Sequence, residues 1–310
     1  MPKRCFACQC LSVAALLGLC SSVAGAQSSG QDNTTITVNY VYAAQLGIGT
    51  YDIGGLSVNV FTLPLSTTRP LSGIFDLGPA ADNAEDWRIR FKFAPSFGSF
   101  DFEQTDPDFG KIDIQQHTLA FTPGLELIAP VNDIWAIKPS MDVGLGKIIS
   151  SSGAGAGDEN YFVTYTAGLR SLVELPAREY TFALGNGVIY AGNSELGGSD
   201  SEAYWAIETG IQVRRSLGFS LADIGFDNPN DAGAVPEVGI YFVHYYFPDP
   251  LLFSRFRDVP LEVNNQFEFG LTLGSATPWD FLKISNPQIG ASYIFGDDLD
   301  AFRINFGFPF

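Results

Sequence analysis

The sequence has few of the residue types on which most metal and redox sites depend. It contains four cysteines and two histidines in 310 residues, and Cys5, Cys8, Cys10 and Cys20 all lie close to the start. If that start is removed, the remaining chain has neither disulfides nor cysteine metal sites. Basic residues are also scarce, with 17 Lys and Arg against 34 Asp and Glu, a formal net charge of −17. This balance argues against nucleic acid as a partner.

Long apolar runs are missing from most of the chain. After residue 26 no apolar run approaches the roughly 18 residues that a membrane-spanning helix needs. Before it, Lys3 and Arg4 precede a short apolar stretch at 11–19, and Ala24-Gly25-Ala26 follows. This pattern predicts a Sec-type signal peptide over residues 1–26, cleaved before Gln27. We therefore expect one domain over residues 27–310.

Alternation of apolar and polar residues is the dominant pattern that remains. In a β-strand, successive side chains point to opposite faces. In the segment 87–93, Trp87 shares a face with Ile89, Phe91 and Phe93, whereas the basic side chains occupy the other face. Three cations facing a dry interior would be prohibitively costly. A transmembrane barrel instead accepts them in a wet lumen and turns its apolar face to lipid.

Similar segments recur along the chain. With short turns between them they predict an all-β, antiparallel, up-and-down transmembrane barrel of about twelve strands, with ten or fourteen as alternatives. Two connections, 66–86 and 215–234, are long enough to contain the additional strand pairs. The predicted strands are 35–50, 56–65, 87–93, 117–127, 135–145, 161–173, 180–190, 203–214, 238–247, 261–274, 287–295 and 302–310.

The polar faces of these strands predict which side chains line the lumen. Seven basic and four acidic residues fall on them. One interpretation is a pore that prefers anions, because lumen charge sets selectivity. The other is a row of structural ion pairs in a barrel too narrow to hold an open channel. The candidates are Arg88, Arg90, Lys92, Lys138, Arg170, Arg214, Arg303, Glu126, Asp142, Glu208 and Glu268.

Aromatic residues mark two further features. Trp87, Trp135 and Trp205 each stand at the start of a predicted strand, where an interfacial girdle places them. The last nine residues alternate strictly and end in phenylalanine. Such an ending resembles the carboxy-terminal signal that outer-membrane assembly machinery reads. Its predicted outward residues are Phe302, Ile304, Phe306, Phe308 and Phe310.

Catalytic and metal-binding patterns are weak. His117 and His244 share the parity of outward apolar residues, and neither lies in the His-x-Ser-Asn arrangement of barrel phospholipases. The acidic segment 101–108 is dense enough to consider for calcium, but solvated charge is the better interpretation. The segment 227–231 starts like a calcium loop but has Ala232 at the sixth position. We predict no catalytic residues, no metal and no cofactor.

Several segments resemble those of the solitary autotransporter-like outer-membrane β-barrel family. They are Gly47-Ile-Gly-Thr-Tyr51-Asp-Ile-Gly-Gly55-Leu, Pro123-Gly-Leu-Glu-Leu127, Ala167-Gly-Leu-Arg170-Ser-Leu and Phe306-Gly-Phe-Pro-Phe310. The resemblance implies a twelve-strand barrel like an autotransporter translocator but without a passenger. It implies no settled activity and no catalytic residues. The short stretch between Gln27 and the first predicted strand also leaves no room for a passenger.

The sequence therefore predicts a non-enzymatic protein of the Gram-negative outer membrane. It would be a narrow, porin-like channel for small anionic solutes, or a structural or surface-interaction protein with acidic extracellular loops. An outer-membrane hydrolase is the least favoured of the three. The expected partners are outer-membrane lipid, lipopolysaccharide and the barrel assembly machinery, and the sequence does not specify an oligomeric state.

Overall fold

The computed structural model describes residues 48–53, 56–73, 87–106, 110–150, 159–196, 201–224, 234–253, 261–275, 280–281, 284–285, 288–297 and 299–310, all within the unit Ile36–Phe310. The predicted signal peptide and most of the predicted strand 35–50 lie outside these residues. Within them, no helix is long and apolar enough to cross a membrane.

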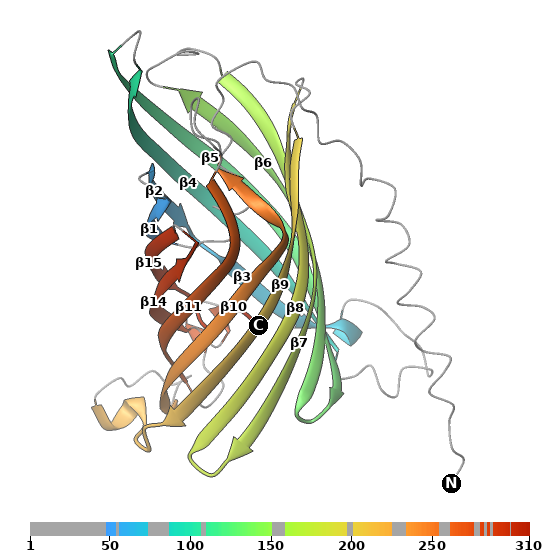
Figure 1. The fold of residues 1–310 in the computed structure, drawn as a ribbon. Coiled ribbons are helices and arrows are strands. Elements are labelled where there is room, and N and C mark those ends of the chain that lie inside the picture. Colours follow the sequence, from blue (N-terminus) through green and yellow to red (C-terminus); the bar gives the residue numbers. More distant parts are fainter. Residues whose placement is uncertain are drawn as a thin grey trace. The chain divides into compact units, whose positions relative to one another are not determined.

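Antiparallel strands make up nearly all of this unit (Figure 1). Two short 3₁₀ helices, η1 (Leu71–Gly73) and η3 (Leu221–Ile224), lie in connections, as does the small hairpin β12 (Asp280–Phe281) and β13 (Ile284–Ser285). The strands of the main sheet are β1 (Ile48–Ile53), β2 (Leu56–Thr62), β3 (Leu65–Pro70), β4 (Arg88–Asp106), β5 (Gly110–Asn132), β6 (Trp135–Ser150), β7 (Glu159–Ala177), β8 (Tyr180–Glu195), β9 (Ser201–Ser216), β10 (Pro236–Phe253), β11 (Leu261–Ser275), β14 (Ile289–Gly296) and β15 (Leu299–Asn305).

The sheet closes on itself. Each strand pairs with its neighbour along the chain, and β1 pairs with β15 from Ile48↔Ile304 to Ile53↔Leu299. β2 and β3 both pair with β4, on consecutive stretches. Pro64 lies between them and has no N–H to donate to the ladder, so it interrupts what is otherwise one strand. Counted this way, the barrel has twelve strands, which confirms the predicted fold.

The two long connections contain no extra pair of wall strands in the parts that the structure describes. Residues 66–73 continue β3 and form η1, and residues 215–224 end β9 and form η3. In the second connection, Asp223 accepts a hydrogen bond from Ser220 N at 2.7 Å and its own N–H donates to Ser220 Oγ at 3.3 Å. The first of these bonds, from the Ser220 backbone to the carboxylate, is the main reason that the pKa of the exposed Asp223 carboxyl lies below its usual value.

The outer surface is apolar, as the alternation requires. On β6, Met141, Val143 and Leu145 are each about half exposed or more, while the intervening Asp142 and Gly144 face inward. On β15, Phe302 is 59% exposed and alternates with the buried Arg303. The inner and outer faces of the wall therefore differ sharply in polarity along these strands.

The end of the chain differs from the prediction. We expected an outward alternation through residue 310, but β15 ends at Asn305. Phe302, Ile304 and Phe306 are exposed, whereas Phe308 and Phe310 lie against inward-facing glycines of β8 and β9. The physical reason is Gly307, whose φ of 112° reverses the side-chain alternation at that point. Glycine adopts this conformation without the strain that a Cβ would add.

Inward glycines elsewhere make room for large rings on neighbouring strands. Gly270 on β11 lies directly opposite Tyr241 on β10, and a Cβ on Gly270 would lie 2.2 Å from the Tyr241 ring. Gly146 on β6 and Phe162 on β7 form a similar pair, at 2.0 Å. Each ring covers the bare backbone of the glycine opposite to it, which is how aromatic side chains support glycine in sheets.

We predict that Gly270→Ala destabilises the barrel, because the added methyl overlaps the Tyr241 ring. Overpacking of this kind costs about 1–3 kcal/mol. Gly168→Ala is the matched control, since its nearest neighbour would be the side-chain hydroxyl oxygen of Ser140 at 3.1 Å. The check is the urea midpoint of unfolding of both variants in the same lipid vesicles. Equal midpoints would contradict the proposed packing.

Candidate functional site in the barrel interior

The first feature of the interior is a cluster of buried apolar side chains, which we call the apolar layer. They come from nine different strands around the barrel. Of them, Val58, Val263 and Ile294 have no exposed surface. The layer consists of Tyr51, Val58, Val60, Phe162, Ile189, Ala191, Tyr204, Ala206, Phe247, Leu251, Val263, Ile294, Leu299 and Ala301.

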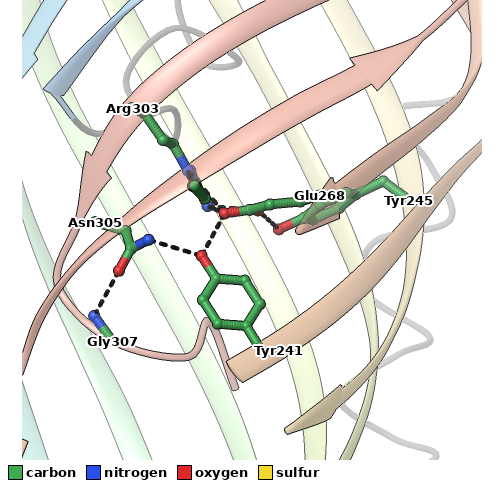
Figure 2. A network of polar contacts seen from close by, with 7 residues as sticks. Tyr241, Tyr245, Glu268, Arg303, Asn305 and Gly307 are labelled. Atoms are coloured by element: carbon green, nitrogen blue, oxygen red, sulfur yellow. Dashed lines mark hydrogen bonds and ion pairs between the residues drawn. The ribbon is translucent and has the colours of Figure 1, made fainter. Parts of the chain in front are cut away.

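The second feature is a polar network centred on Glu268 of β11 (Figure 2). Arg303 of β15 donates through Nη2 to both carboxylate oxygens of Glu268, at 2.6 Å each. The hydroxyls of Tyr241 and Tyr245 donate to the same carboxylate, at 2.5 and 3.0 Å. Glu268 has no exposed surface. With a further bond from Arg303 Nε at 3.0 Å, five hydrogen bonds from two other strands satisfy a carboxylate that would otherwise be costly to bury.

The network continues towards the end of the chain. Arg303 Nε donates to Ser292 Oγ at 3.2 Å, and Asn305 Nδ2 donates to the Tyr241 hydroxyl at 2.8 Å. Asn305 Oδ1 in turn accepts the N–H of Gly307 at 3.3 Å. The strand alternation explains why these groups meet, because Arg303 and Asn305 share the inner face of β15. One side of the network therefore holds the residue at which the chain leaves the wall.

Further ion pairs line the interior on other strands. Arg170 of β7 donates to both oxygens of Glu208 on β9, at 2.9 and 3.2 Å. Between them lies β8, where Gly187 leaves room: a Cβ there would be 3.0 Å from Arg170 Cγ and 3.1 Å from Glu208 Oε2. The remaining pairs are Arg90–Glu126 at 2.8 Å, Lys92–Asp142 at 2.6 Å, Arg214–Glu237 at 3.2 Å and Arg214–Glu174.

These features follow one another along the barrel. On β9, the inward residues run from Ala206 in the apolar layer to Glu208 in the ion pairs and then to Gly210 against the chain end. On β8, Ile189, Gly187 and Gly185 follow the same order. The interior thus has an apolar part, a charged part and an aromatic part, in that order towards the C-terminal end.

Most of the predicted lumen residues take part in these pairs, but two do not follow the pattern. Lys138 is 8% exposed and lies among the charges of Glu126, Arg90, Glu174 and Arg170. Arg88 is exposed at the start of β4. The other five predicted basic residues each have an acidic partner: Arg90, Lys92, Arg170, Arg214 and Arg303.

Sequence reasoning missed two of the acidic partners. Glu174 and Glu237 each lie one residue beyond a predicted strand boundary, and β7 and β10 extend past both. The alternation itself would have placed them inward, since Glu174 shares the parity of Arg170 and Glu237 that of Tyr241. With them included, the interior is close to charge balance, which is a correction to the predicted basic excess.

The three tryptophans of the predicted girdle and the two histidines lie on the outer wall or at its rim. Trp135 is exposed at the start of β6 and donates from Nε1 to Ser171 Oγ at 2.8 Å. Trp205 packs on Tyr190 with ring centroids 4.7 Å apart, and Trp87 is half-buried just before β4. His244 stacks on Phe267 at 4.7 Å, and His117 on Phe97 at 5.9 Å.

The two segments considered for calcium binding lie outside the described residues: 227–231 entirely, and 101–108 in their side chains. Among the residues that the structure does describe, no three His, Cys, Asp or Glu side chains gather in a way that could hold a metal ion.

Comparison with solved structures supports the barrel fold. No protein-family model matches the chain, and no curated protein matches it. Among solved structures, the chain is similar to the translocator domain of the autotransporter NalP from Neisseria meningitidis. The TM-score is 0.52 at 12% sequence identity, and the match covers 84% of this chain and 85% of that chain. At this identity the likeness shows an autotransporter-like barrel fold and nothing finer.

We predict that Glu268→Ala strongly destabilises the barrel, because it leaves the Arg303 guanidinium buried without its carboxylate. Loss of one partner of a buried ion pair costs about 3–5 kcal/mol. The control is Glu179→Ala, which breaks the exposed Arg215–Glu179 pair at 3.3 Å and should cost roughly 0–1 kcal/mol. Equilibrium unfolding in urea measures both. A similar small loss for the two variants would show that the buried pair contributes no more than an exposed one.

Proposed function

We propose that this chain, which has an autotransporter-like barrel fold, is an integral outer-membrane protein with a filled lumen. Its role is structural or one of surface interaction, rather than the passage of solutes. The observation that carries the proposal is the combination of an apolar outer wall with an interior occupied by the apolar layer and the ion pairs. A soluble barrel would have the opposite arrangement, with polar side chains outside.

The outer wall supports the membrane location. Soluble monomers rarely expose contiguous apolar patches larger than a few hundred Å². Here large apolar side chains alternate outward on strand after strand, among them Leu119 and Phe121 on β5, Leu145 on β6 and Ile211 on β9. Transmembrane barrels present this kind of band to lipid and flank it with aromatic residues. Trp135, at the rim, suits such a girdle.

The side chains of the interior support an occluded lumen. Steady ion conduction needs a continuous wet path, and narrow apolar constrictions exclude water. The apolar layer is drawn from nine strands, with the partly buried Ala120 of β5 and Ile148 of β6 packed against it, and its members are at most 5% exposed. On the C-terminal side of the apolar layer, five basic side chains form ion pairs with acidic residues. These pairs disfavour binding of a passing anion. A role of the lumen charges in holding the strands together is therefore favoured over selectivity.

Surface interaction is the second half of the proposal. Strand alternation places the β4–β5, β6–β7, β8–β9 and β10–β11 connections at the end opposite to the C-terminal end of β15. Those connections and the strand ends next to them carry acidic residues, such as Asp106 at the end of β4 and Asp108 after it. These acidic residues would bind divalent ions that bridge them to lipopolysaccharide phosphates. The barrel assembly machinery is the expected partner during insertion. No enzymatic role is proposed, because the two histidines lie separately in aromatic stacks.

The direct test of the closed lumen is electrical. We predict that the refolded protein in a planar bilayer shows no steady single-channel current, because the apolar layer excludes water. The Phe247→Ala/Tyr204→Ala variant, which removes two rings of the layer, should show larger and more frequent openings. Steady anion-selective openings of the unmodified protein, altered by replacing Arg88 and Arg90, would instead make it a channel.

The membrane location has a test of its own. We predict that Met141→Arg, on the outward face near the middle of β6, impairs insertion and stability by about 2–4 kcal/mol, as expected for a cation at the bilayer centre. Val131→Arg, equally outward but next to the β5–β6 turn, should cost about 0–1 kcal/mol. Heat-modifiable migration and urea unfolding in vesicles measure the difference. Equal tolerance of both substitutions would argue that the outer wall does not contact lipid.

A further inference from the structure

The last five residues, 306–310, which we call the tail, do not continue along the outer wall. Phe306 remains exposed, but beyond Gly307 the chain turns inward and its C-terminus lies within the outline of the barrel (Figure 1). Phe310 reaches β8 and β9, although β14, β11 and β10 separate β15 from β9 in the sheet. The tail therefore crosses the interior rather than following its wall.

A cradle of two glycines receives the tail. A Cβ on Gly185 would lie 2.2 Å from Cγ of Phe310, and all three nearest atoms belong to that ring. A Cβ on Gly210 would lie 2.6 Å from Phe310 Cε2 and 3.1 Å from Phe308 Cε2. No other residue type could occupy these positions without displacing the rings. The cradle is thus shaped for the aromatic side chains that fill it.

Aromatic and polar contacts hold the tail in place. Phe308 packs on Tyr241 with centroids 5.7 Å apart and on Phe310 at 4.9 Å. Tyr241 is itself fixed by Glu268 and by Asn305, whose side chain also accepts the N–H of Gly307 (Figure 2). The buried ion pair and the turn into the lumen therefore belong to one connected network.

We propose that the tail is an internal latch that forms when the barrel closes. The cradle needs β8 paired with β9, and the turn needs Asn305 beside Tyr241. Both conditions are met only when the wall is assembled up to β15. The terminal phenylalanines are therefore exposed only before the barrel closes. After closure they seal the C-terminal end of the lumen. The proposal rests on the proposed function in one respect: the latch closes a barrel that lies in a membrane.

A disulfide between the cradle and the tail tests the latch. The Cβ of residue 310 is one bond from Cγ, the ring atom that would lie 2.2 Å from a Cβ on Gly185. The two Cβ atoms are therefore close enough for a disulfide, whose Cβ atoms lie roughly 3.5–4.5 Å apart. In the full chain with its four native cysteines replaced by serine, Gly185→Cys/Phe310→Cys should cross-link in most of the folded protein. Gly185→Cys/Phe306→Cys should not, since residue 306 points outward.

Two controls make the result decisive. Ala183→Cys/Gln212→Cys, an inward pair directly opposite each other on β8 and β9, reports that oxidation works inside the folded barrel. Gly185→Leu fills the cradle, so a single Phe310→Cys in that background should react much faster with a water-soluble thiol reagent than in the unfilled barrel. Absence of the Gly185–Phe310 cross-link, in protein that forms the control disulfide, would overturn the latch.

Failure of the latch and failure of the proposed function give different results. A heat-modifiable, membrane-inserted barrel without the cross-link leaves the proposed function in place and removes the latch. A cross-linked protein that tolerates Met141→Arg as well as Val131→Arg keeps the latch and removes the membrane location. The same set of variants therefore separates the two proposals.

Discussion

The buried contact between Arg303 and Glu268 is the interaction on which the rest of the interior depends. It joins the last strand of the barrel to β11, and its two tyrosine partners add β10. A buried charge pair earns little net stability by itself, but removing one member is costly. Its effect here is to fix which strands meet and in which register. The seam between β1 and β15 and the turn at Gly307 both lie next to it.

A single alternation along each strand produces two different environments. Outward side chains are aliphatic or aromatic and form a continuous apolar wall, while inward side chains are either packed in the apolar layer or paired by charge. Glycine has a consistent use on the inner face: Gly187, Gly185 and Gly270 each leave space for a long or flat side chain from elsewhere. These features are the basis for our proposal that the lumen is filled by side chains of the wall and by the end of the chain.

Much of this architecture could be predicted from the sequence. The parity of apolar residues located eleven of the twelve wall strands, because a shift of one residue would turn a whole strand inside out. The first predicted strand, 35–50, lies mostly outside the described residues and overlaps β1 only at 48–50. Strand ends were harder to predict, because long strands extend beyond the part whose outward side chains must be apolar to face lipid. The alternation weakens there, and for this reason Glu174 and Glu237 were missed.

The partners of the charged residues depend on register across strands, which a single sequence does not reveal. Arg170 and Glu208, for example, meet across an intervening strand through the gap that Gly187 leaves. The inward tail was the clearest error. Alternation continues unbroken through Phe308 and Phe310, and only the backbone conformation of Gly307 reverses it.

The central claim is that the middle of the lumen excludes water. Ala206 offers the most direct measurement, because it lies in the apolar layer, is 4% exposed, and changes little in size when replaced by cysteine. In the folded, membrane-inserted chain without other cysteines, Ala206→Cys should be inert to a charged, water-soluble thiol reagent and react fully after unfolding. Rapid reaction in the folded barrel, from either side of the membrane, would show a wet lumen and contradict the account.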